Sequence, residues 1–161
     1  MTTTAHFPIL PVLLALHVLS VIIWVGGMAF VTTVILPALA DLPVPERIPA
    51  FLEIERRFGL QARIWVSVAG ATGGAMLARL RLPAQVGTWH GLWLEGMIAF
   101  WAFFMLLLFV LEPAFLHRWL RDRGACDGET TRRLLLRGHA VLLGLAVLVV
   151  VGAVLGMQGI G

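Results

Sequence analysis

Four long apolar stretches constrain this chain more than any other feature of its sequence. A bilayer hydrocarbon core of about 30 Å requires about 20 apolar helical residues to cross it. The segments that reach this length are 8–36, 60–80, 90–116 and 134–157. They account for most of the chain and leave no soluble domain over. The sequence therefore predicts an all-α integral membrane protein, a single transmembrane domain of residues 1–161 folded as an antiparallel four-helix bundle.

The composition agrees with this class. Hydrophobic residues make up 60% of the 161 residues and charged residues 13%, and the mean hydropathy is +0.93. A soluble domain carries about 25% charged residues. The pI near 11 does not indicate a nucleic-acid partner, because the arginines fall in connections that would lie beside lipid headgroups. We expect the lipid bilayer, and no nucleic acid, as a partner.

The distribution of arginine predicts the orientation of the bundle. The first and third connections hold ten of the arginines: 47, 56, 57, 63, 118, 121, 123, 132, 133 and 137. The second connection holds only Arg79 and Arg81. Connections rich in basic residues stay in the cytoplasm. We therefore expect both termini on the outer side of the membrane.

The first connection contains a pattern of its own. Apolar residues recur at positions 48, 51, 52 and 58, while charged residues lie mostly on other faces. That spacing is typical of a short amphipathic helix lying in the membrane interface between spans one and two. A structural ramp into the second span explains the pattern about equally well.

Ionisable groups inside a span are costly and are functional candidates by default. His17 lies about a third of the way across the first span, and Trp24 follows at i+7 on the same helical stripe. Two interpretations stay open for His17: it ligates a cofactor, or it makes a hydrogen bond between helices. Trp24 would line the pocket of a cofactor.

Further polar groups lie in the third and fourth spans. His90 stands at the outer boundary of the third span, and Glu95 lies slightly deeper, near the level of His17. We expect Glu95 to be protonated or paired, and to handle protons or orient a ligand. His117 and His139 form a second pair at similar depth near the cytoplasmic side, and Glu112 could orient His117.

Two histidines at one depth on different helices are what axial ligation of haem requires. His17 is the first expected ligand, and the second is open between His90 and His139. Arginines at the membrane edge, Arg137 among them, would bind the propionates. Copper, held by His17, His90 or His139 together with methionines, is the alternative metal. A membrane scaffold without any cofactor is the third possibility.

Two stretches carry a resemblance to a known group of bacterial membrane proteins. The stretch "ALHVLSVIIWVGGMAF", residues 15–30, and the stretch "EIERRFGLQARIWVSVAGATGGAML" resemble the copper-resistance D (CopD) domain and the HemJ-type protoporphyrinogen oxidases. The resemblance implies a bacterial inner membrane. In the HemJ type the first-span histidine belongs to a haem b site, which implies that role for His17 and Trp24.

The sequence thus favours a haem b-binding redox protein that transfers electrons or oxidises a small hydrophobic substrate. Its expected partners are a quinone, a porphyrin or another redox protein, and a homo-oligomer is compatible with the small residues in its spans. Whether it is an enzyme stays open.

Overall fold

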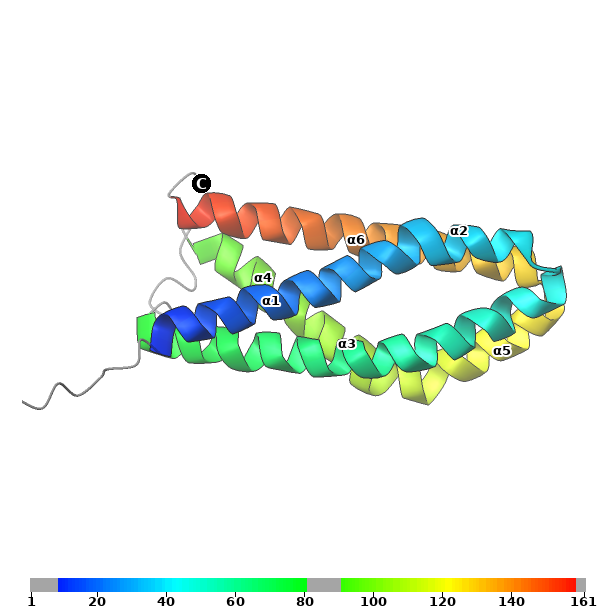
Figure 1. Cartoon of the computed structure of the whole chain (residues 1–161), viewed down its shortest axis with the longest axis horizontal. Helices are drawn as coiled ribbons and strands as arrows, with labels where there is room; N and C mark the ends of the chain where they lie inside the picture. Colours follow the sequence, from blue (N-terminus) through cyan, green and yellow to red (C-terminus); the bar gives the residue numbers. More distant parts are fainter. Residues whose placement is uncertain (1–8, 81–90, 159–161) are drawn as a thin grey trace, which may run out of the picture.

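The computed structural model describes residues 9–80 and 91–158, and this part of the chain is helical almost throughout (Figure 1). Four long helical rods run back and forth along the molecule, which confirms the predicted all-α, four-helix architecture. α1 begins and α6 ends at one end of the molecule, which we call the terminal end. The opposite end, formed by residues 39–57 and 117–133, is called the arginine-rich end.

The first rod is a single helix with a change of pitch. It consists of α1 (Ile9–Phe30), a π-helical turn η1 (Val31–Ile35), α2 (Leu36–Ala38) and a 3-10 turn η2 (Leu39–Asp41). Pro37 follows the π-helical turn, and a proline ring disrupts the preceding helical hydrogen bonds. The predicted first span, 8–36, therefore continues for about one further turn before the chain reverses.

The second rod, α3 (Val44–Leu80), differs from the sequence-based expectation. The predicted interfacial helix and the predicted second span form one helix of 37 residues. The apolar stripe of its first half also faces protein, since Ile48 and Phe51 are buried against Leu120 and Leu135. Because other helices of the bundle bury this apolar stripe, α3 does not have to lie flat on a membrane to cover it.

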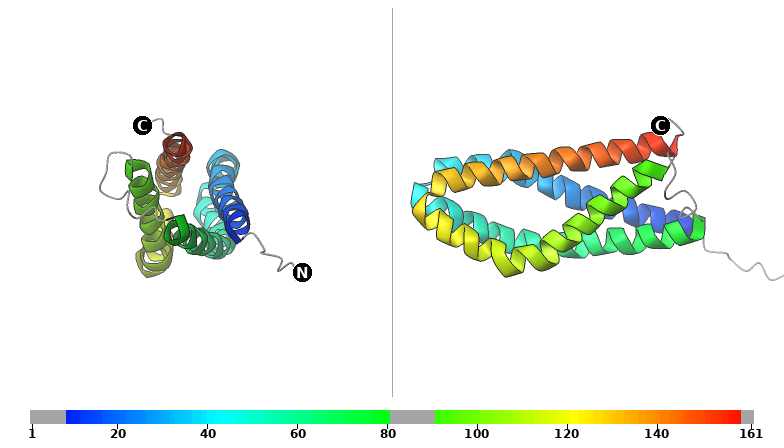
Figure 2. Two further views of the ribbon diagram at one scale, coloured as in Figure 1. Left: turned by 90° about the vertical axis from the view of Figure 1, so that its left-hand side faces the viewer. Right: turned by 180° about the vertical axis from the view of Figure 1, so that it is seen from behind.

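The third rod also changes pitch. α4 (Leu92–Leu106) leads into a π-helical segment, η5 (Leu107–Leu116), and then into α5 (His117–Cys126). Pro113 lies inside η5 and has no N–H to donate to the helix. This rod crosses the molecule diagonally (Figure 2), with α4 beside α6 and α5 beside α3.

The fourth rod is α6 (Gly128–Met157), which begins about two turns before the predicted span 134–157. Asp127 caps it, because its Oδ1 accepts a hydrogen bond of 2.9 Å from the backbone N–H of Thr130. Hydrogen bonding to Thr130 lowers the pKa of Asp127. Glu129 in the first turn pairs with Arg47 of α3, which joins the two helices at the arginine-rich end.

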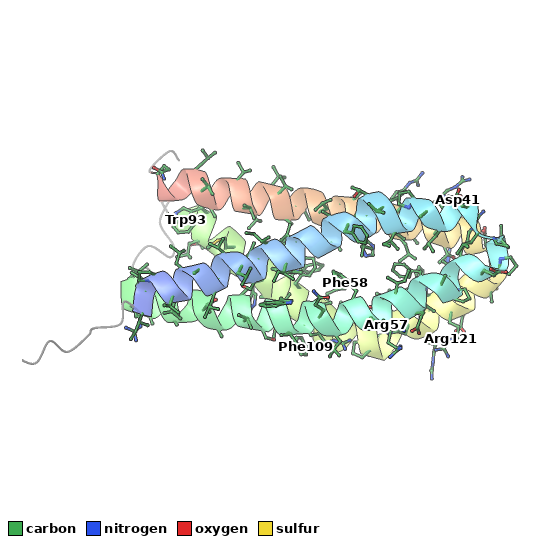
Figure 3. All side chains as sticks on the ribbon, in the orientation of Figure 1. Asp41, Arg57, Phe58, Trp93, Phe109 and Arg121 are labelled. Carbon is green, nitrogen blue, oxygen red and sulfur yellow. The ribbon has the colours of Figure 1, made fainter. Side chains whose placement is uncertain are left out.

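Large apolar side chains cover the outside of the bundle (Figure 3), among them Val141, Leu148 and Phe115 at 62%, 67% and 68% exposure. Three helices of the described chain are long and apolar enough to cross a membrane: Ile9–Asp41, Leu92–Cys126 and Gly128–Gly156. α3 is not among them, because charged residues fill its first half and small or weakly polar ones its second. That residues 60–80 also cross stays a prediction.

Close helix contact depends on glycines that meet large rings. Trp101 of α4 lies over Gly70 of α3, where an added Cβ would come within 2.5 Å of ring atoms of the indole. The indole is held in place, since its Nε1 donates a hydrogen bond of 3.0 Å to the carbonyl oxygen of Val66. Such packing drives helix association in membranes, where lipid is as apolar as the helix surface.

We therefore predict that Gly70→Ala destabilises the bundle by about 1–3 kcal/mol, the usual cost of overpacking. Gly74→Ala is the matched control, because an added Cβ there meets nothing within 4 Å. Thermal unfolding of both variants in detergent measures the difference. Equal stability of the two variants would show that the Trp101–Gly70 contact is not tight in the folded protein.

Candidate functional site

Ionisable groups gather where α3, η5 and α5 meet, and all of them are buried or half-buried. Glu55 and Arg63 come from α3, Glu112 from η5 and His117 from the start of α5. The side chains of Glu112 and Glu55 are 5% and 16% exposed, and those of Arg63 and His117 are 28% and 33% exposed. Four ionisable groups that are shielded from water in this way need opposite charges or hydrogen bonds from one another. We call these four residues the carboxylate–histidine cluster.

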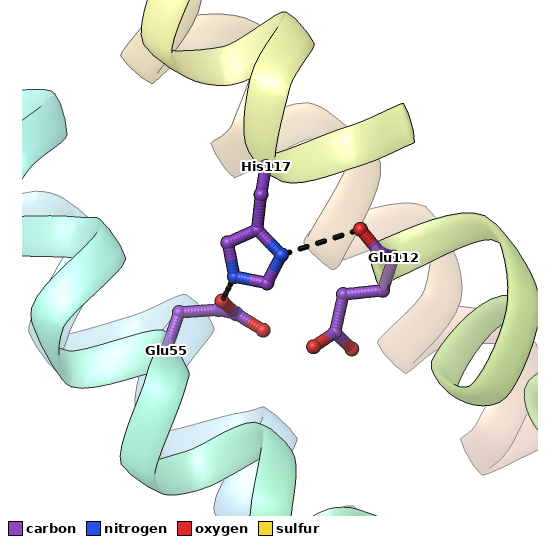
Figure 4. Close-up of side chains that lie close together, drawn as sticks. All are labelled: Glu55, Glu112 and His117. Carbon is purple, nitrogen blue, oxygen red and sulfur yellow. Dashed lines mark hydrogen bonds and ion pairs between the residues drawn. The ribbon is translucent and has the colours of Figure 1, made fainter. Parts of the chain in front are cut away.

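The π-helical segment brings two members of the cluster together. Glu112 and His117 are five residues apart, and in an α-helix they would point about 140° away from one another. In a π-helix, residues i and i+5 are joined by a hydrogen bond and lie on one side. The His117 N–H indeed bonds to the Glu112 carbonyl, and both side chains face α3 (Figure 4).

Arg63 compensates two groups at once. Pro113 has no N–H, so it leaves the carbonyl of Leu108, five residues earlier, without its π-helical donor. The Nε of Arg63 donates to that carbonyl oxygen at 2.9 Å. Its Nη2 donates to Oε1 of Glu112 at 2.7 Å, in an ion pair. The guanidinium therefore satisfies both a backbone defect and a buried carboxylate.

His117 is held in one orientation. Its Nδ1 lies 3.2 Å from the carbonyl oxygen of Glu112, and because a carbonyl can only accept, Nδ1 carries the hydrogen. This agrees with the expectation that Glu112 orients His117, although the backbone does so and not the carboxylate. Nε2 then faces Oε2 of Glu55 at 2.6 Å.

The close contact between Nε2 of His117 and Oε2 of Glu55 favours a protonated imidazole beside a carboxylate. Two lone pairs would repel at 2.6 Å, whereas opposite charges attract at this distance. Among the described residues this buried oxygen meets no donor with hydrogen-bond geometry, so its contact with His117 is an ion pair by distance. With Arg63 neutralising Glu112, the cluster is neutral when the shared proton is bound and carries one negative charge when it is lost.

His17 makes the interhelical hydrogen bond that the sequence left open as one interpretation. Its Nδ1 lies 3.0 Å from the carbonyl oxygen of Ala69 and 3.2 Å from Oγ1 of Thr72, both on α3. Gly73 makes room for the ring, since a Cβ there would be 3.2 Å from Cε1 of His17. Nδ1 is therefore the protonated nitrogen, and Nε2 keeps the lone pair that could ligate a metal.

Trp24 is buried in an aromatic cluster about two turns further along the same face of α1 as His17. Its ring centroid lies 4.8 Å from that of Phe104 and 5.8 Å from that of Phe100, both on the third rod. Trp24 is 5% exposed and belongs to the core of the bundle. In this structure it packs against protein, which accounts for its depth in the span.

His17 and His139 do not meet. The ring of His139 contacts Phe51, with centroids 5.9 Å apart, and its Nδ1 donates to Leu135 of its own helix at 3.0 Å. His17 contacts α3 at Ala69, 18 residues beyond Phe51, which is about 27 Å along a helix. His139 therefore cannot be the second ligand of an iron bound to His17. It lies instead within electrostatic reach of Glu55, beside the cluster.

The remaining predicted site residues are scattered. Glu95 is half-buried in the first turn of α4, at the terminal end. Arg137 is exposed on α6. His90 lies outside the described residues.

Sequence reasoning did not identify Glu55 and Arg63 as site residues. Arg63 counts in the sequence among the basic residues of a connection, and no pattern singles out Glu55. The available indication was Pro113 inside an apolar span, with Glu112 directly before it and His117 four residues after it. Prolines and π-helical turns inside helices are often found at functional sites.

Comparisons of this chain with models of known protein families, with curated proteins and with solved structures find no match. The fold and the site by themselves define the class of protein: a multi-helix, apolar bundle with a carboxylate–histidine cluster between its helices.

We predict that Arg63→Ala destabilises the protein by about 1.5–3 kcal/mol, because it leaves a buried carboxylate and a carbonyl without their charged donor. Unfolding in detergent measures the loss. Arg56→Ala is the control: Arg56 is 66% exposed and pairs with Glu53 at the surface, so its removal should leave the stability nearly unchanged.

The double variant Arg63→Ala with Glu112→Gln tests the cause. Removing the charge of Glu112 should recover part of the stability lost with Arg63. If the double variant is as unstable as the sum of the two single variants, the ion pair does not carry the effect.

Proposed function

We propose that this chain is a proton-handling membrane protein in which the Glu55–His117 pair takes up and releases one proton. The supporting observation is the 2.6 Å contact between Nε2 and Oε2, made while Nδ1 already donates to a carbonyl. Carboxylates and histidines inside membrane bundles commonly form proton relays. The pair lies in the half of the bundle next to the arginine-rich end, from which the proton would enter.

The proposal gives each member of the cluster a task. Glu55 and His117 exchange the proton, and Arg63 holds Glu112 in place beside them. Gly59 leaves the space in which the two carboxylates approach, because a Cβ there would be 3.0 Å from an oxygen of each. Loss of the proton leaves a net negative charge in a low-dielectric site, so proton release is coupled to any change that brings in positive charge.

Infrared difference spectroscopy of the full-length protein between acidic and alkaline pH tests this proposal. We expect bands of carboxyl and imidazole groups that change with pH, and we expect Glu55→Gln to remove them. Glu53→Gln is the matched control: Glu53 lies on the same helix but is 54% exposed, and hydrogen bonding to Arg56 lowers its pKa. Identical difference spectra for the wild type and Glu55→Gln would contradict the proposal.

A second proposal retains the haem b site at His17 and the kinship with the CopD/HemJ-like group. The hydrogen bond from Nδ1 to the Ala69 carbonyl supports it, because ligating histidines usually donate their other ring N–H to such a partner. His90 is then the remaining candidate for the second ligand. Glu95 would handle protons at that end, and Arg137 has no part in the site.

Under this second proposal the chain is a redox protein of the bacterial inner membrane, with both termini on the outer side. It transfers electrons or oxidises a small hydrophobic substrate, with a quinone, a porphyrin or another redox protein as its partner. Copper in place of haem, or a scaffold without a cofactor, are the competing outcomes.

The visible spectrum of the purified protein distinguishes these outcomes. Haem gives a Soret band, which His17→Ala should abolish while the protein stays in the membrane. His139→Ala is the control and should leave the band unchanged. Stoichiometric copper without a Soret band would favour copper, and a colourless, metal-free protein would favour the scaffold. A Soret band that persists in His17→Ala would exclude His17 as the ligand.

A further inference from the structure

We propose that the carboxylate–histidine cluster also binds a divalent transition-metal ion, with Glu55, Glu112 and His117 as its three protein ligands. This inference rests on the proposed function in that it assigns an ion to the same side chains, and the geometry of their ligand atoms carries it. One ligand atom from each residue lies within 4.8 Å of the other two. Small side-chain movements would bring all three atoms into contact with a single ion.

The donor set determines the class of metal. Imidazole nitrogen with carboxylate oxygens suits zinc, manganese and iron(II), whereas calcium and magnesium prefer oxygen alone. Three protein ligands also leave one coordination position open for water or a substrate, as in catalytic zinc sites. The cluster therefore fits an ion that is exchanged or that acts chemically.

The groups around the three ligands are arranged as they are around metal-binding residues. A ligating histidine usually donates its second N–H to a carbonyl or carboxylate, and ligating carboxylates are hydrogen-bonded in turn. Here Nδ1 of His117 donates to the Glu112 carbonyl, which directs Nε2 into the cluster. Arg63 donates to Oε1 of Glu112 and leaves Oε2 for an ion.

Gly59 of α3 leaves room for the two carboxylates to approach one another. A Cβ at this position would come within 3.0 Å of an oxygen of Glu55 and an oxygen of Glu112. Ligands of a tetrahedral zinc ion with bonds of about 2.0–2.2 Å stand roughly 3.3 Å apart. The Glu55–His117 contact needs only a small separation to reach that distance.

Binding exchanges one proton for one ion. The M²⁺ ion forms bonds to Nε2 of His117 and to one oxygen each of Glu55 and Glu112, and the shared proton leaves to solvent. The net charge of the cluster with Arg63 then changes from zero to +1. The charged or titratable neighbours are Arg63 on α3, Glu112 on η5, His117 on α5 and His139 on α6.

The experiment uses the full-length protein in detergent after treatment with a chelator. Zn²⁺ is titrated by calorimetry in two buffers of different ionisation enthalpy, which counts the protons released, and Co²⁺ is titrated by visible absorption. We expect one ion per chain, release of one proton, and at least about a tenfold loss of affinity in Glu55→Gln and in His117→Asn. Glu53→Gln and His139→Asn are the controls and should bind as the wild type does.

The outcomes separate this inference from the proton site. If Zn²⁺ fails to bind while the pH-dependent infrared bands depend on Glu55, the metal inference is overturned and the proton site stands. If Zn²⁺ binds equally well to Glu55→Gln and His117→Asn, the ion binds elsewhere and the inference is likewise overturned. If both the bands and the binding are absent, both proposals fail.

Discussion

The ion pair between Arg63 and Glu112 is the interaction on which the arginine-rich half of the bundle depends. A carboxylate with 5% of its side chain exposed is stable only beside a positive charge or a proton, because burial removes its hydration. Arg63 meets that need and also satisfies the Leu108 carbonyl that Pro113 leaves open. By joining α3 to η5 at this point, it also sets where Glu55 meets His117.

The π-helical segment of the third rod brings Glu112 and His117 to the same side of the helix. A regular α-helix would direct Glu112 and His117 to different faces, and one of them would meet lipid. The π-helical segment turns both toward α3, and the carbonyl of Glu112 then fixes the ring of His117. A proline inside a helix removes a backbone hydrogen bond. Here the carbonyl of Leu108, which Pro113 leaves without a donor, accepts a hydrogen bond from Arg63.

The three described histidines share one hydrogen-bonding arrangement with different consequences. In His17, His117 and His139 the Nδ1 atom donates to a backbone carbonyl, so in each ring Nε2 is the atom left for chemistry. Only in His117 does that atom face carboxylates in a compensated cluster. What each Nε2 atom can bind depends on the groups around it, and the position of a histidine within an apolar span does not predict those groups.

Apolar length and the arginine pattern in the sequence were sufficient to predict four helices, their order and their antiparallel arrangement, because crossing a bilayer imposes a minimum length on each apolar segment. The sequence also singled out His117, as an ionisable residue at the end of the third span, and Glu112 as a group that could orient it. It could not predict that 44–80 is one helix, nor that Glu55 and Arg63 face the third rod. Those contacts join residues about 50 positions apart, and only the packing of α3 against a locally widened helix decides which side chains meet.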